Sequence, residues 1–139
     1  MNRFVLDASV AVAWVSASPV DPYAITVQSR IQSGWRAVVP SLWQLEVANG
    51  LLMIERRKTL TAADVSRGLL DLDAFLASKA EVDQTLVPMQ HLVDLGRTYQ
   101  LTVYDAAYLE LSQRESLSMA TLDKNLRAAA VKAGVGLFK

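Results

Sequence analysis

The sequence predicts an α/β domain with a central parallel sheet of about five short strands, flanked by helices. Two observations predict this fold class: short apolar runs alternate with longer segments of helical periodicity, and 52% of the 139 residues are apolar, enough for a substantial core. Strands of a parallel sheet are buried on both faces and therefore appear as short, continuous apolar runs. The sequence contains no repeat, low-complexity segment or linker, so we expect one domain over residues 1–139.

The first half of the chain contains two predicted strands, each followed by helices. Phe4–Leu6 is a short apolar run, and the Ala-rich segment after it has helical length. Asp21 and Pro22 are the N-cap and first residue typical of a helix start, and Ser41 and Gln44 have the spacing of a capping box. The predicted elements are a strand over 4–6, a helix over 8–15, a helix over 21–34, a strand over 37–39 and a helix from 41 to about 57.

The second half continues the alternation of strands and helices. Thr61 and Asp64 repeat the capping-box spacing, and Thr102 and Asp105 form a third such pair. Gly134 is a typical helix stop. The predicted elements are a helix from 61 to at least 76, a minor strand near 82, a helix over 86–99, a helix from 102 to about 115, a strand over 118–122, a helix over 124–133 and a strand over 135–138.

The composition excludes several classes of site. The chain has no cysteine and one histidine, which excludes disulfide frameworks, thiolate metal sites, Cys nucleophiles and His-rich zinc sites. Its 14 Lys and Arg residues balance 14 Asp and Glu residues, so a nucleic-acid ligand would need a local basic patch. Any chemistry must therefore use carboxylates, hydroxyls and amides.

The sequence predicts a cytoplasmic protein with no membrane partner. Its longest apolar run, Val10–Val15, is far below the roughly 18 residues that span a bilayer. A signal peptide is disfavoured because Asp7 interrupts the stretch that would form its apolar centre.

Acids that follow strands are candidates for chemistry, because ligands of open parallel sheets bind at the carboxyl ends of the strands. Asp7 follows the first predicted strand, and Asp123 follows the strand over 118–122. Each acid also has the position of an N-cap for the next helix. For either acid taken singly, that structural role is the favoured interpretation.

Two further candidate acids, Glu46 and Asp105, lie on predicted helices. Glu46 shares the apolar stripe of its helix, with Asn49 one turn further, and a carboxylate on such a face must be paired, protonated or bound to a cation. A partly exposed Glu at the edge of the helix explains the same pattern equally well. Asp105 lies near a helix start, where the third position of a capping box is a strong alternative role.

The four acids together indicate a metal site. If they converge on one crevice, their charges repel one another strongly unless a hard cation lies among them. Mg²⁺ fits, with Mn²⁺ as the alternative, since both ions take oxygen ligands and require neither His nor Cys. Such a site suits hydrolysis of a phosphodiester. Ser9 and Thr121 could add hydroxyl hydrogen bonds, although capping or turn formation explains these two residues at least as well.

Four segments of the chain occur in the order and spacing of a known family. They are Val5–Ser9, the helix over 43–51, Tyr104–Leu109 and Ala120–Asp123. In these segments the chain resembles the PIN-domain nucleases and, more narrowly, the VapC-type toxins of toxin–antitoxin systems, over its whole length. The resemblance assigns the family's catalytic and metal-binding acids to Asp7, Glu46, Asp105 and Asp123, and its small hydroxyl groups to Ser9 and Thr121.

The resemblance implies a Mg²⁺-dependent endoribonuclease, a homodimer and a neutralising antitoxin as partner. RNA as the substrate comes from the resemblance alone. The basic residues that could hold phosphates near the acids are Arg3, Arg36, Lys124, Arg127 and the Arg56–Lys58 cluster. For the Arg56–Lys58 cluster, stabilisation of a helix C-terminus is the favoured interpretation. An antitoxin could place an Arg among the acids, in a groove whose walls we expect to be the helices over 24–31 and 42–54.

Other interpretations compete with a toxin nuclease. A phosphoryl-accepting receiver domain requires adjacent acids after the first strand, where this chain has Asp7–Ala8, and a phosphatase with an Asp nucleophile prefers a second acid where it has Ser9. A plain interaction domain with capping acids remains open, but it explains neither Glu46 nor the co-occurrence of the four segments. Among nucleases, the alternative is a housekeeping RNA-processing PIN nuclease without an antitoxin.

Overall fold

Four parallel strands form the central sheet, in the order β3-β2-β1-β4. The computed structural model describes residues 2–139. Its strands are β1 (Arg3–Leu6), β2 (Arg36–Pro40), β3 (Ala80–Asp83) and β4 (Met119–Ala120). Its helices are α1 (Ala8–Ser16), α2 (Pro22–Gln32), α3 (Trp43–Arg56), α4 (Ala62–Lys79), α5 (Met89–Tyr99), α6 (Val103–Glu115) and α7 (Lys124–Lys132). The α/β fold class predicted from the sequence is confirmed.

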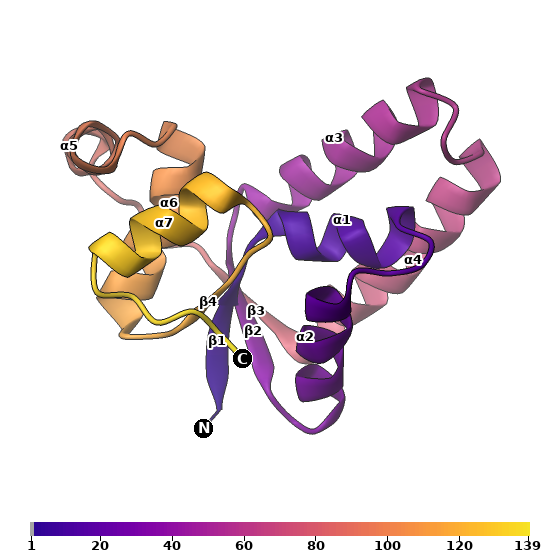
Figure 1. Ribbon diagram of the computed structural model, residues 1–139, viewed down its shortest axis with the longest axis horizontal. Helices are drawn as coiled ribbons and strands as arrows, with labels where there is room; N and C mark the ends of the chain where they lie inside the picture. Colours follow the sequence, from indigo (N-terminus) through magenta and orange to yellow (C-terminus); the bar gives the residue numbers. More distant parts are fainter. Residues whose placement is uncertain (1) are drawn as a thin grey trace.

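The strand order creates a switch point between β1 and β4. From β1 the chain moves outward to β2 and β3, then returns past β1 to place β4 on its other side. Helices α1–α4 therefore lie on one side of the sheet and α5–α7 on the other (Figure 1). In such sheets the connections of two neighbouring strands diverge at the switch point and leave a crevice at their carboxyl ends.

The strands are short apolar runs because both faces of the sheet are covered. Phe4, Val5 and Leu6 are fully buried, as are Met119 and Ala120. Burial of each large side chain stabilises the fold by about 1.5–3 kcal/mol, so the strands of this sheet consist of apolar residues.

No helix among residues 2–139 is long and apolar enough to cross a membrane.

Several predicted boundaries shift in the structure. The predicted capping box at Ser41 is wrong: α3 begins after Leu42, and no side chain caps it. The helix predicted over 86–99 begins only at Met89, because Pro88 disfavours helical backbone in the residue before it. By contrast, Thr61 and Asp64 form the predicted reciprocal capping box of α4.

The fifth predicted strand is reduced to one bridge. Leu137 pairs with Met119 alone, through hydrogen bonds from Met119 N–H to Gly136 O and from Phe138 N–H to Met119 O. β4 covers two residues rather than the five predicted over 118–122, because the chain turns away from the sheet at Thr121. A strand this short can pair with the C-terminal segment at one position only.

Candidate functional site

Asp7 and Asp123 lie at the switch point, at the carboxyl ends of β1 and β4. Asp7 directly follows β1, and its N–H donates to Ala120 O at 2.9 Å, which ties it to the neighbouring strand. Both acids also cap helices: the Asp7 carboxylate accepts from Ser9 N–H at the start of α1, and Asp123 accepts from Leu126 N–H at the start of α7. Asp7 and Asp123 therefore both have the capping role expected as the alternative, and both also lie at the crevice.

Glu46 on α3 and Asp105 on α6 complete what we call the carboxylate cluster, made up of Asp7, Glu46, Asp105 and Asp123. Burial raises the pKa of Asp105 to about 6, and the negative charges of the other three acids add to the rise. Burial also raises the pKa of Glu46, with a further contribution from the charge of Asp7. Residues up to 116 positions apart in the sequence thus act on one another electrostatically.

Asp7 is the most enclosed member of the cluster. Only 5% of it is exposed, and burial raises its pKa while its hydrogen bonds oppose the rise. All three of those hydrogen bonds in the described chain end on Oδ2: they come from Ser9 N–H, from Ser9 Oγ–H and from Thr121 Oγ1–H at 2.8 Å. The hydroxyl groups of these two residues therefore orient Asp7 and leave Oδ1 for another partner.

The same two hydroxyls organise the turn after β4. Thr121 Oγ1 accepts from Asp123 N–H at 3.0 Å, and Ser9 Oγ accepts from Leu122 N–H at 3.0 Å. Arg127 adds a third link by donating to Thr121 O at 2.8 Å. These bonds hold Asp123 in position relative to Asp7. Ser9 and Thr121 therefore have both of the roles expected from the sequence: they form the turn, and they donate hydrogen bonds to a carboxylate of the site.

Tyr108 is a site residue that sequence reasoning missed. It lies on α6, one turn after Asp105, is fully buried, and donates its hydroxyl hydrogen to Glu46 Oε1 at 2.6 Å. Burial and the neighbouring carboxylates raise the pKa of Tyr108 far above its usual value, so the hydroxyl remains a donor. Its spacing from Asp105 is a signal in the sequence, but a Tyr on an Ala-rich helix face is equally typical of a core residue.

Two other expectations for the site are not met. Asn49 lies exposed on α3, one turn beyond Glu46, and joins no hydrogen bond to the cluster within residues 2–139. Arg3 and Arg36 lie at the amino ends of β1 and β2, at the opposite edge of the sheet, where both pair with Glu81. They cannot hold phosphates beside the cluster, because Asp7 and Asp123 follow the carboxyl ends of β1 and β4, at the opposite end of the parallel sheet.

The donor chemistry of the cluster fits a hard divalent cation. The ion pairs within residues 2–139 involve other acids, so no Lys or Arg neutralises these four carboxylates. Carboxylate oxygens without a positive partner are the ligands that Mg²⁺ and Mn²⁺ prefer. In the described part of the chain, no three of the acids lie close enough together to form a ready-made metal site.

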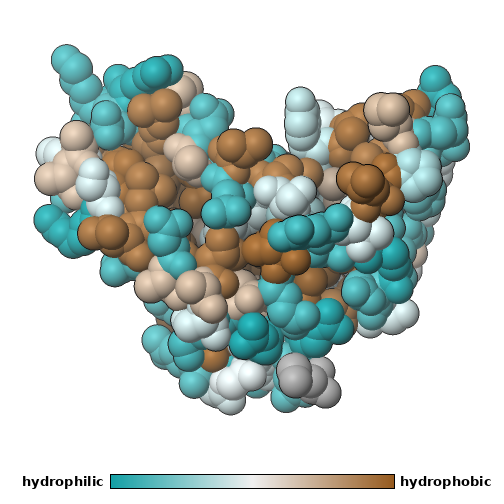
Figure 2. Space-filling model, turned by 180° about the vertical axis from the view of Figure 1, so that it is seen from behind, coloured by the Kyte–Doolittle hydropathy of each residue, from teal (hydrophilic) through white to brown (hydrophobic). Residues whose placement is uncertain are grey.

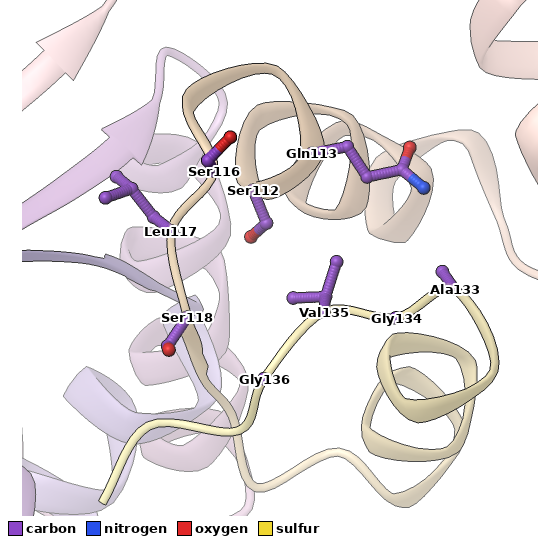
Figure 3. Close-up of a pocket in the computed structure, with 9 residues that line it drawn as sticks. All are labelled: Ser112, Gln113, Ser116, Leu117, Ser118, Ala133, Gly134, Val135 and Gly136. Atoms are coloured by element: carbon purple, nitrogen blue, oxygen red, sulfur yellow. The ribbon is translucent and has the colours of Figure 1, made fainter.

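The surface is hollowed between the two groups of helices, and Figure 2 shows apolar side chains on both sides of this hollow. A separate cavity of about 410 Å³ lies near the amino end of β4, between the C-terminal ends of α6 and α7. Ser112 points into that cavity, which contains none of the four acids (Figure 3).

Solved structures share this fold. The crystal structure of PAE2754 from Pyrobaculum aerophilum matches with a TM-score of 0.69 and 22% identity, over 92% of this chain and 84% of that one. The structure of VapBC2 from Rickettsia felis bound to a DNA fragment from their promoter matches with a TM-score of 0.66 and 12% identity, over 98% and 97%. That of FitAcB from Neisseria gonorrhoeae matches with a TM-score of 0.63 and 15% identity, over 98% and 96%.

The family is shown by the sequence match rather than by these distant structures. No curated protein matches the chain. The model of the PIN domain, whose members are generally nucleases that use divalent metals, matches residues 4–132. This span contains the four strands except for Arg3, all seven helices of the described residues and the whole carboxylate cluster. The chain therefore belongs to the PIN domain family.

Proposed function

We propose that this protein is a Mg²⁺-dependent endoribonuclease, with Mn²⁺ as the alternative ion, and that it acts as the toxin of a toxin–antitoxin pair. The observation that carries the nuclease is the convergence of four carboxylates without a basic partner at the β1–β4 switch point. The type of nucleic acid and the role as a toxin rest on the resemblance to VapC-type toxins.

Asp7, Glu46, Asp105 and Asp123 would hold the cation. When bound, the ion supplies positive charge to the phosphoryl group and lowers the pKa of a water molecule. The chain's own contribution is orientation: Ser9 and Thr121 set the direction of the Asp7 carboxylate, and the cap of α7 holds Asp123.

Cleavage assays on the purified protein test the nuclease. We expect RNA to be cut with Mg²⁺ or Mn²⁺ and to remain intact with excess chelator, and single-stranded DNA of the same sequence to be cut poorly. Asp7→Asn, Glu46→Gln, Asp105→Asn and Asp123→Asn should each lower the rate by about a hundredfold or more, because each removes a charged ligand with little change in shape. A folded Asp105→Asn variant that cleaves RNA like the parent would refute the site assignment.

An antitoxin is the proposed protein partner. A guanidinium group suits an acidic cluster because its planar fork can bind two carboxylate oxygens at once. The likeness in fold to VapBC2 of Rickettsia felis and FitAcB of Neisseria gonorrhoeae supports a partner of this kind. Helices α2 and α3, which we expected to form the walls of the groove, both pack against α1, which lies between them (Figure 1).

Two grooves run along α4. One of about 260 Å³ lies between α1, α2 and α4 and contains Trp14 and Phe75, and another of about 370 Å³ lies between α3 and α4 and contains Leu45 and Leu69. Leu45 is 76% exposed, which is unusual for a large apolar side chain. An amphipathic antitoxin segment placed along α4 would cover this surface.

Expression in cells distinguishes a toxin from a housekeeping nuclease. We expect the chain to stop growth when it is expressed alone, and co-expression of the protein encoded beside it to restore growth. If the chain is harmless at high level while the purified protein still cleaves RNA, the toxin role fails and the RNA-processing nuclease replaces it. Action in the cytoplasm follows from the proposed RNA substrate.

A homodimer is also proposed. Leu86, three residues before α5, and Met89, its first residue, are 95% and 83% exposed, and Tyr104 on α6 is 65% exposed. Met89 and Tyr104 come from two helices that pack against each other, α5 and α6. An apolar surface of this kind is typical of a contact between subunits. Light scattering on the purified protein measures the mass directly, and a monomer at all concentrations would contradict the dimer.

A further inference from the structure

We infer that Tyr108 is a positioning residue that selects which oxygen of Glu46 is available to a cation in the carboxylate cluster. The inference rests on the proposed metal-dependent nuclease and adds to it a residue outside the four acids. The observation that carries it is a single, partly buried hydrogen bond between two helices, from Tyr108 Oη–H on α6 to Glu46 Oε1 on α3.

The bond fixes the Glu46 carboxylate in one orientation. A Glu side chain on the surface of a helix rotates freely about its bonds, and its two oxygens are chemically equivalent. Here Oε1 is held at 2.6 Å by a hydroxyl that is itself rigid, because Tyr108 is 0% exposed. No other hydrogen bond in residues 2–139 ends on Glu46, so Oε2 is the oxygen left for a cation.

Tyr108 also connects two of the elements that build the site. Its ring comes from α6, one turn after Asp105, and its hydroxyl reaches Glu46, 62 residues earlier in the chain. The position of the Glu46 carboxylate on α3 is therefore tied to the helix that carries Asp105.

The arrangement resembles the support that metal ligands receive elsewhere in proteins. A carboxylate that binds a metal through one oxygen is usually held through the other by a hydrogen bond, and loss of such a partner weakens metal binding or activity by about 10–100-fold. Tyr108 cannot contact RNA, because it is fully buried. Its loss should therefore change the dependence on metal rather than the affinity for substrate.

The variant Tyr108→Phe tests this role, since it removes one oxygen and keeps the ring that fills the core. We expect the Mg²⁺ concentration for half-maximal stabilisation against heat, and for half-maximal cleavage, to rise about 10–100-fold. The KM for RNA at saturating Mg²⁺ should stay within about twofold of the parent value. The rise in melting temperature with Mg²⁺ is a readout that does not depend on catalysis.

The matched control is Tyr23→Phe. It removes a tyrosine hydroxyl hydrogen bond of the same 2.6 Å length, which ends on the backbone oxygen of Phe138 rather than on a carboxylate. We expect it to lower the melting temperature without changing the Mg²⁺ dependence. A control that shifts the Mg²⁺ dependence as much as Tyr108→Phe would overturn the specific role of the Glu46 contact.

A double-mutant cycle separates positioning through Glu46 from a general structural effect. In a Glu46→Gln background, Tyr108→Phe should change Mg²⁺ binding by less than about threefold, because the group that it orients is no longer a carboxylate. An equal loss in both backgrounds would overturn the inference. If the parent protein neither binds Mg²⁺ nor cleaves RNA, the proposed function itself fails. If the parent does both and Tyr108→Phe has the same Mg²⁺ dependence as the parent, only the inference about Tyr108 is refuted.

Discussion

Replacing Asp105 by Asn should stabilise the metal-free protein at neutral pH. Burial and three neighbouring carboxylates raise the pKa of Asp105 from 3.8 to about 6. The folded chain thus holds this proton more tightly than the unfolded chain, and the free energy of unfolding falls as the pH rises from 3.8 to about 6. Below that window the acid is protonated in both states and costs nothing, and above it the full penalty is present.

The expected size follows from the same pKa values. At about 1.4 kcal/mol per pH unit, the rise corresponds to a penalty of at most about 3 kcal/mol at pH 7. Asp105 is partly exposed, so solvent screening reduces this to about 1.5 kcal/mol. Asn also loses the favourable interaction of a carboxylate with the first turn of α6, about 0.5 kcal/mol. The net gain of about 1 kcal/mol corresponds to a rise in melting temperature of about 3 °C.

Melting curves followed by circular dichroism in excess chelator measure the effect. We expect Asp105→Asn to melt above the parent at pH 7 and no higher than the parent at pH 4, and added Mg²⁺ to stabilise the parent more than the variant. Asp71→Asn, at an exposed acid of α4 outside the cluster, is the control and should match the parent under all conditions. Repulsion among the four carboxylates would be refuted if the melting temperatures of Asp105→Asn and the parent differed equally at pH 4 and pH 7, or did not differ at either pH.

Two further substitutions test the structure around the site. Thr121→Val should lower the free energy of unfolding by about 1–3 kcal/mol, because a fully buried hydroxyl that serves both Asp7 and Asp123 N–H is lost, while Thr121→Ser should retain most of the stability in the same urea titration. Gly68→Ala should lower the free energy of unfolding by about 1–3 kcal/mol, because the added Cβ on α4 would lie 2.5 Å from a side-chain carbon of Val15 on α1. An unchanged urea midpoint would show that the two helices can separate without cost.

Elements governed by local interactions could be predicted from the sequence. Asp21 caps α2 through Tyr23 N–H, and Thr61 and Asp64 bond reciprocally at the start of α4. These bonds join residues two or three positions apart, so their partners are visible in the sequence. The same applies to β1 and β2, whose apolar runs report burial on both faces of the sheet.

Elements that depend on distant partners could not be predicted in this way. The last predicted strand pairs at Leu137 alone, because its neighbour β4 is only two residues long. Tertiary structure also decided that Ser41 does not cap α3. β2 continues to Pro40, and the helix begins only after the chain has turned away from the sheet.

For the candidate site, the sequence by itself determined the kinds of side chain and their positions relative to the strands and helices. Without Cys and with one His, the chain had only carboxylates to offer a metal, and two of them had to follow strands. Tertiary structure alone decided which acids meet, because strand order placed β4 beside β1 and brought Asp123 to Asp7. It also decided that Tyr108 bonds to Glu46, since the packing of α6 near α3 joins residues 62 positions apart, and no local pattern encodes such a contact.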